Sequence, residues 1–341
     1  MGGQAVQASD LLQRFRREGY DVGFLPVNPK YPGILGLLQR IKYVRTLLTW
    51  PAYLISLLAR IPRYDVLHLF SASYLSFLLA PAPAAIIGKL FGKRVVLNYH
   101  SGEAEDHLQR SSAAVKSILK FVDCVVVPSQ YLQQIFDRFG IETTAIPNVV
   151  EMEAFRFRQR KTFQPRLLVS RTLEPIYNIT CILKAFRFIQ DSIPAASLTI
   201  LGSGSQELAL RALADELSLQ QVSFAGRIER RDIPRYYADH DIMLNASNID
   251  NLPLSIIEAF AAGMPVVSTE AGGIPFIIRN RETGMLVPLN DCRRLADSTL
   301  ELLEHQELAH AIASAAYTEC SKLYTWPSVR AKWLQVYESC H

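Results

Sequence analysis

The feature of this sequence that most constrains its fold is a repeated alternation of short apolar runs with helix-like amphipathic stretches. Each run holds four to six mainly β-branched or aliphatic residues, and a stretch with helical spacing follows it. The runs form two series: 65–70, 94–99, 123–128 and 144–147, then 166–170, 197–201, 222–225, 242–246 and 265–269. Such runs are typical of parallel strands covered by helices on both faces. The sequence therefore predicts an α/β protein with two doubly wound domains.

The length of 341 residues agrees with two domains. A polar segment separates the two series, so we predict a first domain over 1–155 and a second over 156–325. The last segment, 326–341, is predicted to be a helix that crosses back to the first domain. The chain opens with a predicted helix over 5–17 ahead of a strand over 21–27. Because a doubly wound domain normally opens with a strand, a first strand is expected to be missing.

The composition excludes several classes of protein and suggests an anionic partner. Hydrophobic residues make up 49% of the chain and charged residues 20%, which excludes a disordered chain. Residues 1–160 carry a net charge of +7 and residues 161–341 carry −3, so a phosphorylated substrate or a membrane surface suits the basic half. Nucleic acid is not expected, since no basic run has interleaved aromatic residues. Five widely spaced cysteines without a CxxC pair predict reduced thiols in an intracellular protein and no zinc site.

No segment is predicted to be a signal peptide or a membrane-spanning helix. The uncharged stretch 69–88 is interrupted by Pro81 and Pro83, so a strand, a turn and a buried helix are expected there. Segment 34–63 combines apolar and aromatic residues with the basic residues Arg40, Lys42, Arg45, Arg60 and Arg63. This pattern suits a helix lying on an anionic membrane. The other interpretation is a helix that packs on the sheet with solvated charges. We expect a cytoplasmic protein, and the first interpretation adds peripheral contact with the inner membrane face.

The most informative segment is a polar loop that leads into a predicted helix. Asp250 lies in the loop, and Glu258 lies eight positions later. The first turn of the helix is expected to contain Pro253, Leu254 and Ser255. A helix N-terminus presents unpaired N–H groups and a positive dipole end, which predicts a cradle for a diphosphate. Glu258 is then placed to accept hydrogen bonds from a ribose, and Asp250 to lie beside a reacting sugar. The alternative is an ordinary strand–loop–helix unit with two surface carboxylates.

This segment resembles the carboxylate-x7-carboxylate signature of the retaining glycosyltransferases of family 4, also called group 1, which have the GT-B fold. Glu258, the Glu-Ala-Phe-Ala-Ala-Gly-Met-Pro-Val-Val string that it begins and the following Gly272-Gly273 match the family pattern. Asp250 departs from it, because the family usually has Glu there. The resemblance covers most of the chain. It implies two Rossmann-like domains facing a central cleft, with a nucleoside diphosphate sugar bound by the second and an acceptor by the first.

The resemblance also implies roles for residues in the first domain. Gly2 and Gly3 resemble the glycine-rich loop that approaches the donor phosphates, and a disordered terminus is the alternative interpretation. His100, at the end of a predicted strand, resembles the histidine that contacts the donor sugar. A histidine at a strand end is more often structural, so that alternative also stays open.

In the second domain, Arg171 resembles the arginine that neutralises the leaving diphosphate. The family usually places a lysine about six residues later, and this chain has Tyr177 there. Gly202 resembles a close approach of the backbone to the donor, and Ile228 resembles the residue whose backbone contacts the base. Glu207 occupies the third glycine position of a dinucleotide fingerprint, which argues against NAD. No cluster has metal-ligand spacing, and the family generally works without a metal, so no cofactor is expected.

The expected activity is transfer of a sugar from a nucleoside diphosphate sugar to an acceptor with retention of anomeric configuration. Asp250 and His100 would hold the sugar, and Arg171 would stabilise the leaving diphosphate. The acceptor is expected to be lipid-linked if the membrane interpretation holds, as in cell-envelope or polysaccharide biosynthesis. Two alternatives stay open. One is a nucleotide-sugar epimerase of GT-B fold, which would need further acid/base residues. The other is a catalytically silent sugar-nucleotide-binding subunit, motivated by Tyr177 and the missing first strand.

Overall fold

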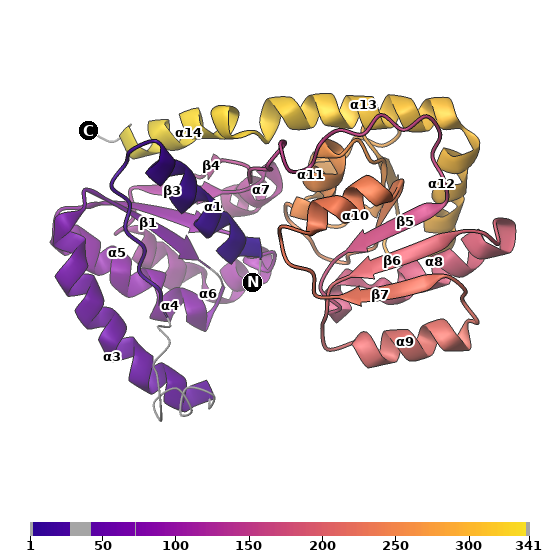
Figure 1. The fold of residues 1–341 in the computed structure, drawn as a ribbon. Helices are drawn as coiled ribbons and strands as arrows, with labels where there is room; N and C mark the ends of the chain where they lie inside the picture. Colours follow the sequence, from indigo (N-terminus) through magenta and orange to yellow (C-terminus); the bar gives the residue numbers. More distant parts are fainter. Residues whose placement is uncertain (1–2, 28–41, 72, 339–341) are drawn as a thin grey trace. The chain divides into compact units, whose positions relative to one another are not determined.

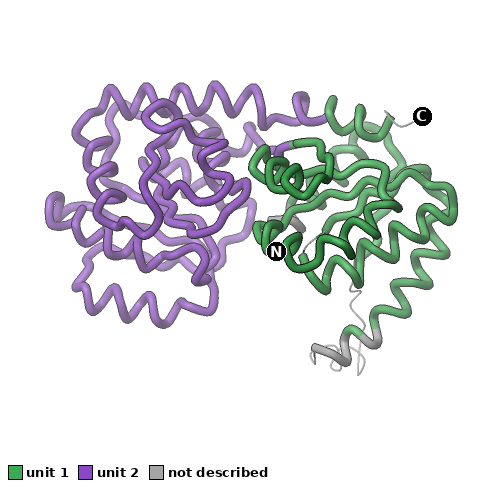
Figure 2. Tube along the Cα trace, turned by 180° about the vertical axis from the view of Figure 1, so that it is seen from behind, with its two compact units in different colours: residues 1–146, 331–341 green, residues 147–330 purple. Residues whose placement is uncertain are grey.

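The computed structural model describes residues 3–27, 42–71 and 73–338 (Figure 1). The chain divides into two compact units, coloured separately in Figure 2: unit 1 is residues 1–146 with 331–341, and unit 2 is residues 147–330. Each unit is built on a parallel sheet, which confirms the predicted α/β class with two Rossmann-like domains.

Unit 1 has a four-stranded parallel sheet in the order β1-β2-β3-β4. Its strands are β1 (Val66–Ser71), β2 (Arg94–Tyr99), β3 (Cys124–Val127) and β4 (Thr144–Ala145). Its helices are α1 (Gly3–Arg17), α3 (Lys42–Arg60), η1 (Ile61–Arg63), α4 (Leu75–Leu79), α5 (Pro81–Leu90), α6 (Ala104–Leu119) and α7 (Gln130–Arg138). The four predicted strands from 65 to 147 are therefore confirmed. Within the described ranges, no helix is both long and apolar enough to cross a bilayer.

The predicted strand over 21–27 is wrong, because these residues have no regular structure. The Arg16 side chain donates two hydrogen bonds, at 2.9 and 2.8 Å, to the carbonyl oxygen of Val22. Arg60 donates to the carbonyl oxygen of Phe24 at 3.3 Å. Arginine side chains thus bond the carbonyl oxygens that would otherwise accept hydrogen bonds from a neighbouring strand. The Phe24 side chain is exposed and does not pack as a strand residue would.

The end of the chain packs on the unit 1 sheet. Helix α14 (Trp326–Glu338) starts among the residues of unit 2, and its residues from Ala331 onward belong to unit 1. His68 on β1 is hydrogen-bonded through Nδ1 to the hydroxyl of Tyr337 at 2.7 Å, and its ring lies 4.7 Å from the Trp333 ring. Arg94 also donates to the carbonyl oxygen of Val336. Through these contacts the last residues of the chain belong to unit 1.

Unit 2 has a six-stranded parallel sheet in the order β10-β9-β8-β5-β6-β7. Its strands are β5 (Arg166–Ser170), β6 (Ser197–Leu201), β7 (Val222–Gly226), β8 (Ile242–Asn245), β9 (Val266–Thr269) and β10 (Met285–Val287). Its helices, besides the start of α14, are η2 (Pro175–Tyr177), α8 (Ile179–Ser192), α9 (Glu207–Glu216), α10 (Ile233–Asp239), α11 (Leu254–Ala261), η3 (Ile274–Phe276), α12 (Cys292–Glu304) and α13 (Gln306–Leu323). Five of the six strands were predicted, and β10, which has three residues, was not.

Both faces of the unit 2 sheet are buried, as predicted for parallel strands. Leu167 and Val169 of β5 pack into the apolar cluster that holds α8 and α12. Leu168, between them, points to the other face and packs with α10 and α11. Residues 147–155 were predicted to belong to the first domain, but they lie in unit 2. The Val150 N–H donates to the Tyr324 carbonyl oxygen at 2.9 Å, and Phe155 is buried in the second cluster.

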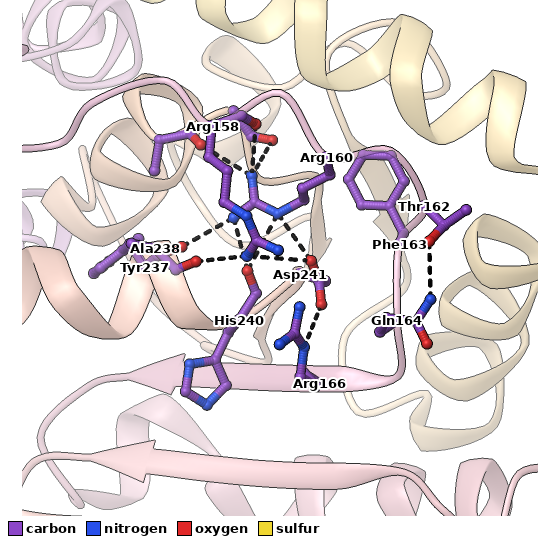
Figure 3. A network of polar contacts seen from close by, with 12 residues as sticks. Arg158, Arg160, Thr162, Phe163, Gln164, Arg166, Tyr237, Ala238, His240 and Asp241 are labelled. Atoms are coloured by element: carbon purple, nitrogen blue, oxygen red, sulfur yellow. Dashed lines mark hydrogen bonds and ion pairs between the residues drawn. The ribbon is translucent and has the colours of Figure 1, made fainter.

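A fully buried arginine fixes the segment that leads into β5 (Figure 3). Arg160 donates through Nε to Asp241 Oδ1 at 3.1 Å. Its remaining donors bond the carbonyl oxygens of Arg158, Tyr237, His240, Ala262 and Gly263. These carbonyl groups include the ends of α10 and α11, where a cation is favourable. Because Asp241 directly precedes β8, this network lies at the amino ends of the strands.

Candidate functional site

The candidate site lies at the opposite, carboxyl ends of β5 and β8. These strands are neighbours, but the chain continues from β5 to β6 on one side and from β8 to β9 on the other. This reversal is the topological switch point, and ligands of open α/β sheets bind at its carboxyl edge. Arg171 directly follows β5, and Asp250 lies in the loop that follows β8. The topology therefore brings together two residues that the sequence analysis had singled out separately.

Arg171 and Asp250 form a mostly buried ion pair. Arg171 Nη2 donates to Asp250 Oδ2, and the side chains are 12% and 13% exposed. Arg171 Nε donates to Asn245 Oδ1 at 3.1 Å, and the guanidinium lies over the Tyr177 ring, 4.9 Å from its centroid. The predicted phosphate-binding cation is thus held on three sides by protein groups.

Backbone contacts fix the loop that carries Asp250. Asp250 Oδ1 accepts from the Asn251 N–H at 2.9 Å, and Oδ2 accepts from the Ser247 hydroxyl at 3.3 Å. The Gly273 N–H donates to the Asp250 carbonyl oxygen at 2.9 Å. A Cβ atom at Gly273 would lie 2.0 Å from the Asn251 carbonyl oxygen, so the close approach requires glycine. This contact gives a physical reason for the second glycine of the Gly272-Gly273 pair, and Gly272 has a positive φ of 53°, which favours glycine.

A buried polar network beneath the ion pair was missed by the sequence analysis. Asn245 faces Ser268 across β8 and β9, and its Nδ2 donates to the Ser268 hydroxyl at 2.9 Å. The Ser247 hydroxyl shares its one proton between Asn245 Oδ1 at 2.9 Å and Asp250 Oδ2 at 3.3 Å. The Thr269 hydroxyl donates to the Ser247 carbonyl oxygen at 2.6 Å. The signal that could have predicted this network is a polar residue at the end of each apolar strand, Asn245 in β8 and Thr269 in β9. Only strand pairing shows that these residues meet.

The N-terminus of α11 has unpaired polar groups. Pro253 caps the helix with extended backbone and without a side-chain hydrogen bond. The Ile256 N–H donates to the Pro253 carbonyl oxygen at 3.1 Å, whereas the N–H groups of Leu254 and Ser255 have no intrahelical acceptor. The Ser255 side chain is buried, with 6% of the residue exposed, and its hydroxyl has no partner among the described residues. A buried hydroxyl without a partner is uncommon and costly, which indicates a place for a polar ligand.

Glu258 is held one turn further into α11 by a tyrosine that the sequence did not single out. The Tyr237 hydroxyl shares its one proton between Glu258 Oε2 at 2.9 Å and the Ser255 carbonyl oxygen at 3.3 Å. Burial, with the nearby Glu258 charge, raises the pKa of Tyr237 well above its usual value, and the Arg171 charge opposes this rise. Tyr237 therefore stays a neutral donor, close to both the carboxylate and the cation.

Gly202 lies against the loop that carries Arg171, whereas Ile228 lies in a separate surface hollow. Gly202 has φ +126°, and a Cβ atom there would lie 1.9 Å from the Arg171 carbonyl oxygen. Only glycine fits at position 202, because the backbone packs directly against the loop that carries Arg171. Ile228 lines a surface hollow of about 590 Å³. Arg171 and Asp250 do not line this hollow, whose other walls are Arg227, Glu229, Arg231, Asp232, Arg235, Tyr236, Asp239 and His240.

The remaining predicted residues belong to unit 1. The His100 N–H donates to the Ser71 carbonyl oxygen at 3.2 Å, and its ring centroid lies 5.7 Å from that of Phe70. Burial lowers the pKa of His100 to about 4, so the imidazole is neutral at pH 7 and has one donor and one acceptor nitrogen. Gly2 lies outside the described residues. Gly3 is the first residue of α1 and not part of a loop, because helical structure already begins there.

Comparison with known families identifies the chain. Residues 151–319 match the family described as Glycosyl transferases group 1, and residues 1–154 match the one described as Glycosyltransferase Family 4. The chain belongs to the group 1 glycosyltransferases. The family predicted from the carboxylate motif is therefore confirmed.

Relatives of this group 1 glycosyltransferase include two mannosyltransferases. The GDP-mannose-dependent alpha-(1-6)-phosphatidylinositol monomannoside mannosyltransferase of Mycobacterium tuberculosis is 26% identical over 202 residues, 57% of this chain and 52% of that protein. The GDP-mannose-dependent monoacylated alpha-(1-6)-phosphatidylinositol monomannoside mannosyltransferase of Corynebacterium glutamicum is 27% identical over 274 residues, 72% of this chain and 71% of that protein. The chain thus spans about half the length of the first relatives that it matches.

A solved structure shows the same fold. Anabaena Alr3699/HepE, in complex with UDP and glucose, has a TM-score of 0.78 at 18% identity, and the match covers 99% of this chain and 96% of that one. At this identity the likeness establishes the GT-B fold alone. Within the group 1 glycosyltransferase, Arg171, Asp250, Gly202, Ser255 and Glu258 surround the switch point of unit 2. Among its described residues, no cluster of three or more histidine, cysteine or acidic side chains is arranged to hold a metal.

Proposed function

We propose that this chain transfers a sugar from a nucleoside diphosphate sugar to an acceptor hydroxyl, with retention of anomeric configuration. The observation that carries the proposal is the pairing of Arg171 with Asp250 at the switch point of unit 2. The unpartnered hydroxyl of Ser255 at the start of α11 supports it, because a diphosphate needs donors at such a place. The names of the relatives, which include GDP-mannose-dependent enzymes, agree with this class of donor.

The chemical difficulty is departure of the diphosphate from the anomeric carbon. Negative charge grows on the leaving phosphate, and preorganised donors stabilise such charge without reorganising. Arg171 and the N–H groups of α11 are the donors in unit 2, and Glu258 accepts from the ribose. Asp250 Oδ1 accepts one backbone N–H and keeps a lone pair for a sugar hydroxyl. His100, whose imidazole is neutral at pH 7, stays the proposed sugar-contacting residue of unit 1.

Retention is best explained by front-face attack. The acceptor oxygen bonds to the anomeric carbon as the carbon–phosphate oxygen bond breaks, and the leaving phosphate takes the acceptor proton. We do not assign Asp250 as a covalent nucleophile, because its carboxylate is engaged by Arg171, Ser247 and the Asn251 N–H. Its charge and geometry fit an electrostatic and positioning role.

A thermal-shift screen against a panel of nucleoside diphosphate sugars tests the donor class. A true donor at about 100 times its dissociation constant should add roughly 2.7 kcal/mol to the free energy of unfolding. The matched variant is Glu258→Gln, whose side-chain oxygen still accepts from Tyr237 but lacks the charge. We expect it to fold normally and to show a smaller shift. The donor assignment fails if no nucleotide sugar stabilises the parent, and the ribose role of Glu258 fails if both proteins shift equally.

We also propose that unit 1 contacts an anionic lipid surface from the cytoplasmic side through residues 34–63, where a lipid-linked acceptor would be presented. Figure 1 shows α3 at the rim of unit 1. One face of α3 is buried through Tyr53 and Leu57, while Ile55 and Leu58 are 67% and 51% exposed. Arg60 and Arg63, at its end, are exposed. Arg40 lies outside the described residues, as do the side chains of Lys42 and Arg45.

Vesicle co-sedimentation tests this surface. At about 1 kcal/mol per basic residue, binding to anionic vesicles should be measurable at low salt and weaken as salt rises. The double variant Ile55→Ser with Leu58→Ser should bind less, because it removes exposed apolar contact without disturbing the buried face. Leu208→Ser, at an 85% exposed site on α9, is the matched control. Equal binding to neutral vesicles, or unchanged binding by the double variant, would contradict the membrane proposal.

A further inference from the structure

The two positions at which this chain departs from its family pattern contact the same side chain. Tyr177 stands where the family usually has lysine, and Asp250 where it usually has glutamate. The Tyr177 ring lies under the Arg171 guanidinium, 4.9 Å from centroid to Cζ, and the Asp250 carboxylate pairs with its Nη2. Both positions therefore act on the same guanidinium.

The guanidinium is restrained but keeps donors. Nε is bonded to Asn245, Nη2 to Asp250, and one face is covered by Tyr177. Nη1 has no hydrogen-bond partner in the described part of the chain. A planar guanidinium has five N–H donors in a fixed fork, so two in-plane contacts and one stacked ring set its orientation and leave an edge for a ligand.

The two departures are also joined through the backbone. The Asn248 N–H, in the loop that carries Asp250, donates to the Ile176 carbonyl oxygen at 2.8 Å, next to Tyr177. Asn178, with φ +47°, ends η2 and donates to Asn290 Oδ1 at 2.9 Å. The ring of Tyr177 and the carboxylate of Asp250 therefore sit on loops whose backbones are tied to each other.

We propose that Tyr177 and Asp250 are positioning residues that together hold Arg171 as the single preoriented cation for the donor diphosphate, in place of an arginine–lysine pair. The inference rests on the proposed function. A lysine at 177 would put a second positive charge beside the guanidinium and remove the ring that covers it. A glutamate at 250 is one methylene longer, so its carboxylate would leave the hydrogen bonds from Asn251 and Ser247. Each family residue alone should therefore harm this site.

Amide hydrogen exchange tests the positioning without any nucleotide. Tyr177→Leu removes the ring and should speed exchange in peptides covering 171–178, whereas Tyr177→Phe keeps the ring and should protect them as the parent does. Ile176→Ser, at an exposed neighbouring site, is the control for disturbing the turn. Unchanged exchange in Tyr177→Leu would overturn the positioning role.

Binding of UDP and GDP, with kcat and KM for the donor found in the screen, tests the consequence. Tyr177→Leu should weaken nucleotide binding or lower kcat by between about 2-fold and 30-fold, the range of a partly buried cation–π contact. Tyr177→Lys and Asp250→Glu should each be harmful alone, and the double variant should recover part of the loss. If the parent binds nucleotide and Tyr177→Lys alone activates it, or the two losses simply multiply, the inference fails while the proposed function stands. If the parent binds no nucleotide, the proposed function fails, and with it the role given to Arg171.

Discussion

Arg171→Ala is expected to lower turnover by about 100-fold or more, because removal of one donor from a developing oxyanion typically costs that much. The loss should be large here because the position usually held by lysine is Tyr177, so Arg171 is the cation that the site holds ready. The variant also leaves the mostly buried Asp250 carboxylate without its partner. The measurement is kcat with the donor identified by the screen, together with the dissociation constant of the nucleoside diphosphate.

Two further variants serve as a partial rescue and as a control for this prediction. Arg171→Lys keeps the charge but loses the fork that reaches Asn245 and Asp250 together, so it should recover only part of the loss. Lys184→Ala removes an exposed cation further along α8 and should leave kcat unchanged. A kcat for Arg171→Ala within tenfold of the parent would show that the leaving diphosphate is stabilised elsewhere.

Arg160→Met is expected to lower the free energy of unfolding of unit 2 by about 3–5 kcal/mol, the cost of removing one partner from a buried ion pair. The other two cations near Asp241, Arg158 and Arg166, are partly exposed. Asp241 is fully buried, and Arg160 is the partner that is itself fully buried. The variant also removes the donor to five carbonyl oxygens around the ends of α10 and α11. The exchange of the slowest amides in β5 and β8 measures the change.

Arg158→Met is the matched control for this prediction. Its side chain is 36% exposed and lies 3.6 Å from Asp241, so it should cost about 1 kcal/mol or less. If Arg160→Met is no more destabilising than Arg158→Met, then Arg166, at 2.6 Å from Asp241, is sufficient to compensate the buried carboxylate. The role given to Arg160 would then be wrong.

Arg160 and Arg171 differ in whether all of their donor nitrogens are bonded to the protein, and this difference distinguishes a structural arginine from one that can bind a ligand. Every donor nitrogen of Arg160 is bonded to the protein, at the amino ends of the strands. Arg171 keeps Nη1 without a partner in the described chain, at the carboxyl ends where ligands bind. Both stand near predicted strands in the sequence, and nothing in the local pattern distinguishes them.

The fold was largely readable from the sequence because its pattern is local. A buried parallel strand must be an apolar run, and a covering helix must have an apolar stripe, so strands such as 166–170 and 197–201 were predicted with their observed bounds. The prediction of a strand over 21–27 was wrong, because an alternation of apolar residues does not show which donors bond the backbone carbonyl oxygens. In the structure the side chains of Arg16 and Arg60 bond two of them. The predicted domain boundary after 155 lies nine residues beyond the end of unit 1 at 146, because the Val150 N–H bonds the carbonyl oxygen of Tyr324, far along the chain.

The site was readable only in part. The sequence by itself identified the family, because the carboxylate spacing of Asp250 and Glu258 and the glycines that follow are local features of one loop and helix. The resemblance then singled out Arg171 as a candidate. The tertiary structure alone decided that Arg171 pairs with Asp250 and stacks on Tyr177, and that Tyr237 holds Glu258. The physical reason is that 71 residues, 171–241, separate β5 from β8 in the sequence, yet the two strands are adjacent in the sheet. Contacts across that distance depend on strand order, which no short pattern contains.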